Sequence, residues 1–176
     1  TAAGCTVLFD GNGQKGDIGY PMSIPSAPDW GEEINGVRWN RDTNQGWIDL
    51  NLAPAYPASL GVLVFTRRFI FGPENELLIR DRILLEQPRT ISWFYHTDQE
   101  NKPELDQLTG RVGNGELGTL RPQSTDISLQ ASLNRTYQVY SYSSTFAKYQ
   151  HFRYDTEAPL RDVVVTFCIR YDARFL

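Results

Sequence analysis

Stretches in which apolar and polar residues alternate recur along the whole chain, and a period of two is typical of half-buried β-strands. In RTISWFYHT, residues 89–97, the alternation places Ile91, Trp93 and Tyr95 on one predicted face. In DVVVTFCIRY, residues 162–171, every second residue from Val163 is apolar. Convincing helical periodicity over about ten residues is absent, so the sequence predicts an all-β fold.

The alternation predicts strands at Thr6 to Phe9, Gly36 to Trp39, Gly46 to Leu52, Val62 to Phe71, Glu76 to Leu85, Thr90 to Thr97, Gly118 to Pro122, Ile127 to Leu133, Thr136 to Ser143, Gln150 to Tyr154 and Asp162 to Tyr171. Pro73 and Pro88 mark predicted turns between consecutive strands, which favours an antiparallel meander. A single open sheet would leave one apolar face in water. We therefore predict one domain, residues 1–176, folded as a large antiparallel two-sheet β-sandwich of about ten to twelve strands, with a closed barrel as the alternative.

Two long connections interrupt the strand pattern. Residues 15–35 are rich in proline and glycine, and we expect an ordered surface excursion there. Residues 97–117 are rich in Asp, Glu, Asn and Gly and are expected to form a second long connection. Loops of this length in a compact domain are often functional.

Composition and motifs exclude several classes of function. The chain has 17 Lys and Arg against 21 Asp and Glu, and no basic run interleaved with aromatic residues, so nucleic acid is not an expected partner. No apolar stretch reaches the roughly 20 residues of a membrane-spanning helix, so a membrane is not expected either. There is no GxSxG, HExxH or P-loop motif, and no GxGxxG followed by a predicted helix.

The two cysteines, Cys5 and Cys168, do not have the spacing of a zinc ribbon or of a disulfide framework. Cys168 lies within an apolar strand and is predicted to be a small core residue. Cys5 could pair with it if the first and last strands were neighbours, which the sequence alone does not determine.

Four side chains stand out as candidates for chemistry or for buried hydrogen bonding. His96 ends an aromatic strand just before an acidic connection, so it is a metal ligand, a general base or a half-buried structural imidazole. His151 is predicted to lie on the wet face of a strand. Asp49 alternates in phase with Trp47 and faces solvent or a cleft. Asp81 shares an apolar face, so it needs backbone N–H groups or an arginine and is predicted to be a hydrogen-bond hub.

Aromatic and arginine side chains allow a carbohydrate hypothesis. Tryptophan and tyrosine rings offer flat surfaces on which sugar rings stack, and arginines bind carboxylates and sulfates. The candidates are Trp30, Trp39, Trp47, Trp93, Tyr20, Tyr56, Tyr95, Arg67, Arg68 and Arg111. The alternative is that the tryptophans belong to the core of the sandwich.

Four longer motifs occur in a particular order along the first half of the chain. They are TVLFDGNGQ (6–14), IDLNLAPAYP (48–57), VFTRRFIFGPENELLIRDRI (64–83) and WFYHTDQ (93–99). This order resembles the β-sandwich domain of the heparinase II/III-like polysaccharide lyases. In that family an N-T-x-x-x-D-G-x-G-Q strand precedes an Asp, an A-Y-P segment, an Arg-bearing strand and a strand that ends in His. The resemblance covers roughly residues 4–98.

The resemblance implies a protein that cleaves uronate-containing acidic glycans, such as glycosaminoglycans or alginate, by β-elimination. A base removes the C5 proton of a uronate while the leaving oxygen is protonated. In such lyases the catalytic groups come largely from a preceding α/α toroid domain, so the implied partners are an acidic polysaccharide and an upstream helical toroid. Without the toroid we expect no efficient catalysis. The resemblance also implies a periplasmic or secreted location, and it places Gln14, Tyr56 and His96 on the cleft side.

The resemblance also implies a metal site in the sandwich, and two of its ligand positions fall on Asp49 and His96. The position of the first ligand, a His, falls on Gly4, and a catalytic His two residues earlier falls on Ala2. Cys5 could serve as a substitute third ligand. No cofactor is certain, and we expect substoichiometric zinc or calcium in the purified protein.

Two hypotheses from other classes remain beside the lyase domain. One is a stand-alone carbohydrate-binding or structural β-sandwich module without catalysis. The other is an interaction domain of immunoglobulin type, which the sequence disfavours because Cys5 and Cys168 are too widely spaced for the expected Cys, Trp, Cys arrangement.

Overall fold

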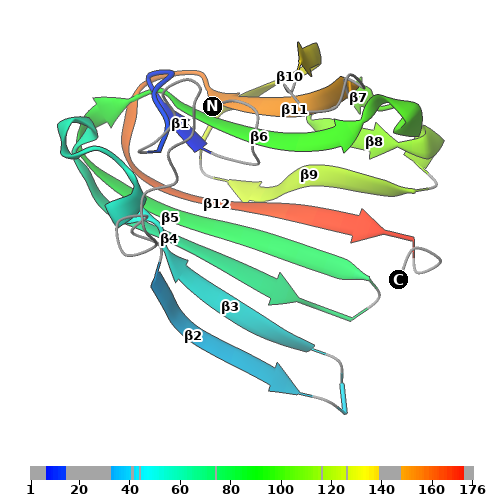
Figure 1. The fold of residues 1–176 in the computed structure, drawn as a ribbon, viewed down its shortest axis with the longest axis horizontal. Coiled ribbons are helices and arrows are strands. Elements are labelled where there is room, and N and C mark those ends of the chain that lie inside the picture. The colour runs from blue at the N-terminus through cyan, green and yellow to red at the C-terminus, as the bar shows by residue number, and fades with distance from the viewer. Residues whose placement is uncertain are drawn as a thin grey trace.

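A computed structural model describes residues 7–14, 33–40, 42–43, 45–73, 75–115, 117–125, 127–138 and 148–172. These residues form two antiparallel sheets (Figure 1). The first has the order β1 (Val7–Phe9), β6 (Ile91–Asp98), β11 (Lys148–Thr156), β10 (Leu129–Gln138). The second has the order β2 (Glu33–Asn40), β3 (Gln45–Asn51), β4 (Val62–Phe71), β5 (Glu76–Arg89), β12 (Leu160–Tyr171), β9 (Gly118–Thr125), β8 (Thr109–Val112), β7 (Glu104–Asp106). The predicted two-sheet sandwich of about ten to twelve strands is confirmed.

Only short 3-10 turns accompany the strands in the part of the chain that the structure describes. They are η2 (Ala53–Ala55), η3 (Ala58–Leu60), η4 (Gln99–Asn101) and η5 (Gly113–Gly115). None of the described helices has the length and apolar character needed to cross a membrane.

Three local predictions were wrong or incomplete. Residues 97–117 are not one long connection, because β7 and β8 pair there and extend the large sheet. Pro88 does not end a strand, because β5 continues through it to Arg89 opposite an irregularity in β12, where a missing N–H is tolerated. Strand β10 spans the break expected after Leu133, while residues 139–143 of the next predicted strand lie outside the described residues.

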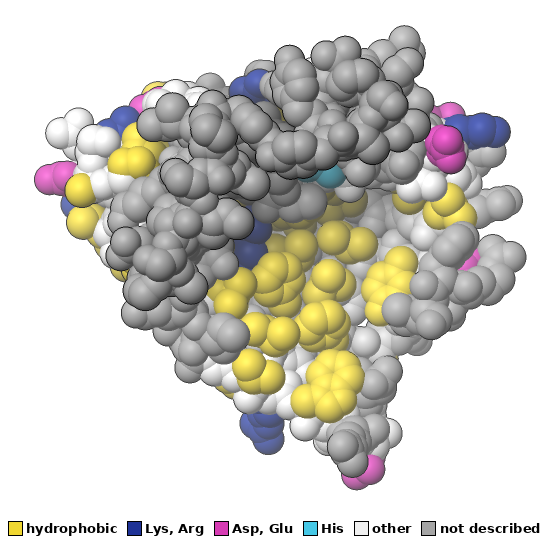
Figure 2. Space-filling model, in the orientation of Figure 1, with side chains coloured by type: hydrophobic (Ala, Val, Ile, Leu, Met, Phe, Trp, Pro, Cys, Tyr) yellow, Lys and Arg dark blue, Asp and Glu magenta, His cyan; other side chains and the backbone are white. Residues whose placement is uncertain are grey.

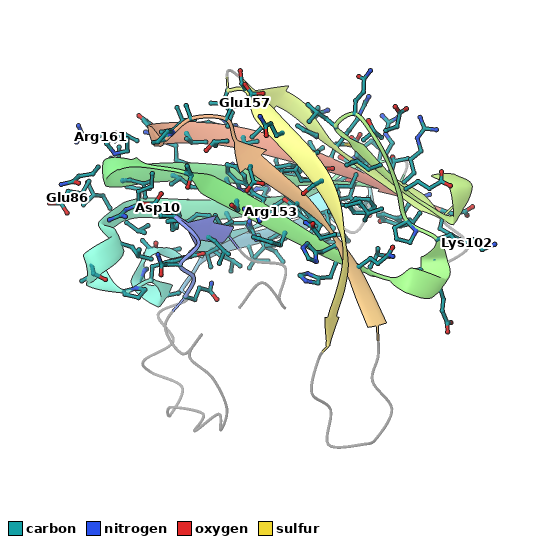
Figure 3. The ribbon with its side chains drawn as sticks, turned by 90° about the horizontal axis from the view of Figure 1, so that it is seen from above. Asp10, Glu86, Lys102, Arg153, Glu157 and Arg161 are labelled. Atoms are coloured by element: carbon teal, nitrogen blue, oxygen red, sulfur yellow. The ribbon has the colours of Figure 1, made fainter. Side chains whose placement is uncertain are left out.

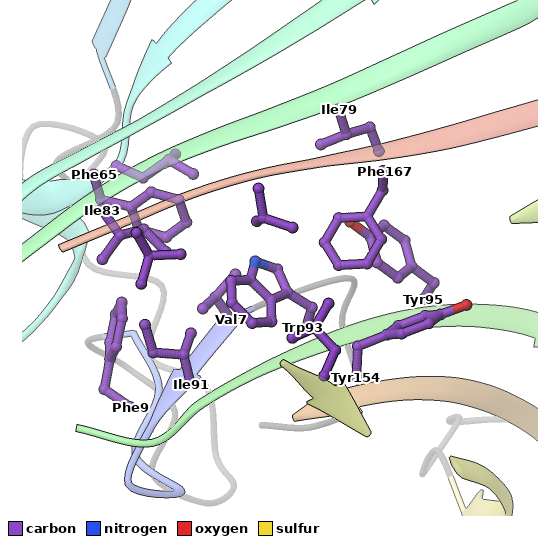
Figure 4. Packing of buried hydrophobic residues seen from close by; sticks show 14 of the residues in the cluster. Val7, Phe9, Phe65, Ile79, Ile83, Ile91, Trp93, Tyr95, Tyr154 and Phe167 are labelled. Carbon is purple, nitrogen blue, oxygen red and sulfur yellow. The ribbon is translucent and has the colours of Figure 1, made fainter. Parts of the chain in front are cut away.

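The core lies between the two sheets and is largely aromatic. The alternation in β6 is confirmed, since Ile91 and Trp93 are fully buried and Tyr95 is nearly so. Figure 4 shows Trp93 and Tyr95 pointing from β6 toward Ile79 and Phe167 of the large sheet. The ring of Phe167 lies 5.8 Å from Trp93 and 5.1 Å from Tyr95, distances at which tilted aromatic pairs attract each other.

A charged group sits at the centre of this apolar core. Asp81 of β5 is fully buried, and its two carboxylate oxygens accept hydrogen bonds from Nε and Nη2 of Arg67 at 2.8 and 2.7 Å. Nε1 of Trp93, on the opposite sheet, donates to the same carboxylate at 2.9 Å. The predicted hydrogen-bond hub at Asp81 is therefore confirmed, and it links strands of both sheets.

Arg67 keeps its charge in the core because Asp81 compensates it. Burial alone would lower the pKa of Arg67, but the carboxylate of Asp81 raises it well above its ordinary value. A buried ion pair of this kind contributes little net stability over an apolar pair, whereas the loss of one partner leaves an uncompensated charge.

The turn after β1 has a structural role. Asp10 has a positive φ of 49° and is followed by Gly11 at 78°, which reverses the chain so that Phe9 bridges Asn12. The Asp10 carboxylate accepts from the backbone N–H of Thr90 at 2.9 Å and from Nη1 of Arg89 at 2.8 Å. Burial alone would raise the pKa of Asp10, but these hydrogen bonds lower it below its ordinary value. The DGNG motif thus ties β1 to the start of β6.

The sheets differ in size, and part of the inner face of the large sheet is not covered by the small one. Figure 2 shows hydrophobic side chains gathered over the β2 to β5 side of the molecule. Trp39 and Val37 of β2 are 50% and 61% exposed, and Trp39 makes an edge-on contact with Phe71 at 5.8 Å. We call the apolar part of this inner face the open apolar face. The strand register places these side chains on it: Val37, Trp39, Ile48, Leu50, Phe69, Phe71 and Leu77.

We expect Asp81→Asn to lower the free energy of unfolding by about 3–5 kcal/mol, because Arg67 keeps its charge in the core without a counter-ion. Urea denaturation of the purified chain measures this loss. The double variant Arg67→Met with Asp81→Leu removes both charges and should recover most of the lost stability. A double variant less stable than Asp81→Asn would contradict this account of the hub.

Candidate functional site

His96 of β6 and His151 of β11 form a cross-strand pair on the small sheet. The two residues are directly opposite each other in the antiparallel register, and their rings lie 5.3 Å apart at an angle of 37°. Because His96 alternates with the inward-facing Trp93 and Tyr95, the pair occupies the face that points away from the shared core.

The histidine pair belongs to a buried aromatic and basic cluster. The ring of Phe94 lies 5.4 Å from that of His151, and the guanidinium of Arg153 lies 5.5 Å from the Phe94 ring. Phe94 and His151 are only 3% and 2% exposed. The prediction that His151 lies on a wet face was therefore wrong, because alternation along one strand does not reveal what covers either face.

The environment of His151 keeps its imidazole neutral. Burial, followed by the nearby His96 and the positive charge of Arg153, lowers the pKa of His151 from 6.5 to about 4. At neutral pH this side chain therefore offers one N–H donor and one nitrogen acceptor rather than a charge.

A hollow of about 250 Å³ opens between the two sheets at the same end of β6 as His96, on the inner side of the strand, whereas the His96 imidazole points away from the core. Its lining includes Tyr95, Phe152, Leu120 and Ile169. Gly110 also borders the hollow, and a Cβ at this position would lie 2.8 Å from the ring of Phe152, so any larger residue would displace that ring. An apolar hollow of this size suits a small apolar group better than a charged sugar.

The structure separates the three residues that the resemblance placed on the cleft side. Gln14 is half-buried and follows the turn after β1, near the start of β6, whereas His96 lies toward the other end of that strand. Tyr56 is 3% exposed, and its hydroxyl donates to the carbonyl of Val7 at 2.8 Å. Tyr56 thus occupies a core position, and only Gln14 and His96 are accessible in part.

Asp49 and His96, the two metal ligands that the resemblance implied, are also not brought together. Asp49 lies on β3 of the large sheet and points away from the core, on the opposite side of the sandwich from the outward-facing His96. Both oxygens of Asp49 accept from Arg68, at 2.5 Å each, and these bonds lower the pKa of Asp49. Within the described ranges no cluster of three or more His, Cys, Asp or Glu side chains is arranged to hold a metal ion, and Cys5 lies outside them.

The arginines that the sequence suggested for uronate binding are all engaged in ion pairs. Arg67 binds Asp81 inside the core, Arg68 binds Asp49 on the outer face, and Nη2 of Arg111 lies 3.2 Å from Asp106. Sequence reasoning did not single out Arg38, Arg80 and Arg121, which are exposed and make no salt bridge with any described residue. The signal that could have found them is their position on the polar side of alternating strands.

We expect the free energy of unfolding to fall as pH decreases from about 6.5 to about 4, because His151 binds a proton in the unfolded chain before it does so in the folded one. The variant His151→Phe removes this proton uptake, so its unfolding free energy should depend less steeply on pH in that window. Urea denaturation of both proteins at a series of pH values measures the difference. Identical pH profiles would show that His151 is not buried as a neutral imidazole.

Comparison with known proteins gives matches of structure only. No family model matches the chain, and the curated proteins give no significant match. Among solved structures, a mutant of heparan sulfate lyase HepC from Pedobacter heparinus matches with a TM-score of 0.66 and 12% identity, over 96% of this chain and 24% of that one. The unmutated HepC gives 0.61 and 13% over the same shares.

A third match is the heparinase III BT4657 gene product, with a TM-score of 0.63 and 11% identity over 97% of this chain and 24% of that one. The chain thus spans about a quarter of the length of the proteins that it matches. At these identities the likeness concerns the fold. In fold, the chain resembles the C-terminal β-sandwich domain of the heparinase II/III-like polysaccharide lyases, as the order of the sequence motifs predicted.

Proposed function

We propose that the chain is the β-sandwich domain of a polysaccharide lyase that cleaves uronate-containing acidic glycans by β-elimination. The observation that carries the proposal is the structural match over nearly the whole chain to two proteins named as a heparan sulfate lyase and a heparinase. The ordered motifs in residues 4–98 support it independently of the structural match.

The proposed reaction needs a base at C5 of the uronate, a group that neutralises its carboxylate and an acid for the leaving oxygen. Among the described residues, we assign contacts with the glycan to His96 and, at a separate point, to Gln14, while the neutral His151 packs against the His96 ring. The family resemblance assigns the catalytic groups to a toroid domain. We therefore propose that this chain lines one wall of the cleft and does not catalyse elimination alone.

The open apolar face supports a partner domain. Exposed tryptophan and valine side chains on one continuous sheet face are unfavourable in water and are typical of surfaces that pack against another domain. We propose that the helical toroid of the same protein packs on this face through Trp39 and Val37. A periplasmic or secreted location follows from the same assignment, since the glycans concerned lie outside the cytoplasm.

A stand-alone carbohydrate-binding or structural module is the second candidate. The observation that favours it is that, among the described residues, His151 is buried, Tyr56 lies in the core and Asp49 is paired with Arg68. The two candidates differ in whether the full-length product cleaves glycans or only binds them.

We expect the full-length gene product, but not the isolated chain, to release unsaturated oligosaccharides from heparan sulfate or another uronate polymer. Ultraviolet absorbance of the new C4–C5 double bond measures the reaction. His96→Gln in the full-length protein should raise KM by about tenfold, the loss of one good contact of about 1.4 kcal/mol, with a smaller effect on kcat. Binding without any unsaturated product would overturn the lyase proposal and favour the module.

We expect Trp39→Ser in the full-length protein to weaken the packing of the toroid by about 2 kcal/mol, the value of a large apolar side chain buried at an interface. Calorimetry would then show separate unfolding transitions for the two domains. Leu63→Ser is the matched control, because Leu63 is also a large apolar residue, 54% exposed, but lies at the irregular edge of β4. Equal effects of the two substitutions would contradict a specific interface at Trp39.

A further inference from the structure

The face of the large sheet that points away from the core carries a regular row of side chains. Residues that are directly opposite on neighbouring strands share a face, and one row runs through β2, β3, β4, β5, β12 and β9. Its members are Arg38, Trp47, Ile70, Leu78, Cys168 and Arg121. An apolar stripe therefore crosses the sheet and ends in an arginine on each side.

The neighbouring rows add charge, with arginines in excess. Arginines and carboxylates pair as Arg68 with Asp49, Arg82 with Asp162 and Arg170 with Glu76. Among the salt bridges between described residues, none includes Arg38, Arg80 or Arg121. This outer face is thus locally positive, although the chain as a whole carries a net charge of −4.

Arg80 is exposed beside another arginine and makes no salt bridge with any described residue. It is directly opposite Arg68 on the neighbouring strand, and like charges in that position repel each other. Asp49 engages Arg68 from the other side, and the guanidinium of Arg68 also lies 4.9 Å from the Trp47 ring. These contacts hold Arg68 in place. The guanidinium of the exposed Arg80 beside it is accessible to an anionic ligand.

A hollow of about 510 Å³ lies at one end of the row. Its lining includes Arg38, Asn40, Gln45, Trp47, Ile70 and Leu78, together with Glu76, whose carboxylate is paired with Arg170. Gly36 on the neighbouring strand leaves room for the ring of Trp47, because a Cβ at Gly36 would lie 2.9 Å from that ring. Arginine, amide and apolar groups in one hollow offer partners for the carboxylate, the hydroxyls and the ring face of an acidic sugar.

The spacing of the three arginines indicates a polymer rather than a single small anion. Neighbouring strands lie about 4.8 Å apart, so Arg38 and Arg121 are separated by roughly 24 Å across the sheet, with Arg80 between them in the next row. We propose that this outer face is a second glycan site, in which Arg38, Arg80 and Arg121 bind successive acidic groups of one polysaccharide chain. The proposal rests on the proposed function for the choice of an acidic glycan over other polyanions.

The test is binding of heparan sulfate to the full-length protein and to the chain, measured by calorimetry at several salt concentrations. Each of Arg38→Gln, Arg80→Gln and Arg121→Gln should weaken binding about two- to fivefold, and the triple variant about tenfold or more, with a shallower salt dependence. Lys102→Gln is the matched control, because it removes one positive charge from an exposed side chain in the connection between η4 and β7, outside the row. In Figure 3 Lys102 projects from the end of the molecule opposite to Arg161 and Glu86. If the triple variant does not fold, the affinities of the three single variants decide the test.

The outcomes separate this inference from the proposed function. Unchanged heparan sulfate affinity in the triple variant would overturn the second site and leave the lyase proposal standing. Loss of affinity in the triple variant, with no elimination by the full-length protein, would support the site and reject the lyase. Equal, arginine-dependent binding of double-stranded DNA or polyglutamate would overturn the choice of a glycan. Retained cleavage of short oligosaccharides by the triple variant, with a raised KM for the polymer, is the expected result.

Discussion

The ion pair between Arg67 and Asp81, extended by Trp93, is the interaction on which the rest of the structure depends. It places a charge in an aromatic core, where only a bidentate partner and an indole N–H from the other sheet make the charge tolerable. The same contacts determine which way two neighbouring strands face. With Arg67 and Asp81 turned inward, Arg68 and Arg80 must point outward, so the arrangement of the outer surface follows from the core.

The unequal size of the two sheets determines where the molecule meets its surroundings. A small sheet covers only part of a large one, which leaves the open apolar face on the inside (Figures 1 and 2). The outer face of the large sheet carries an apolar stripe among arginines and carboxylates. We propose the first surface as the contact for another domain and the second, with its excess of arginine, as the binding face for an acidic polymer. The cross-strand histidines lie on the outer side of the small sheet, where His96 is accessible in part and His151 is buried.

The resemblance to the lyases concerns the fold, and the side chains on these faces show which chemistry the chain itself offers. At 11 to 13% identity the shared property is a sandwich with this strand order, and its chemistry must be judged from the side chains present. Here the buried His151 is neutral and Tyr56 supports the core, while Asp49 is occupied by Arg68. The chain therefore presents surfaces for binding and packing more clearly than it presents a set of reacting groups.

The sequence by itself determined the all-β class, most of the strands and the role of Asp81, because alternation and the solvation of a buried charge are local properties. It also indicated the fold family through the order of its motifs. Only the tertiary structure decided that His151 lies opposite His96, that Asp49 and His96 are on opposite sides of the sandwich, and that Arg38 and Arg121 end one row. Those facts depend on strand register and sheet order, which are set by contacts between residues far apart in sequence, and a period of two carries no information about them.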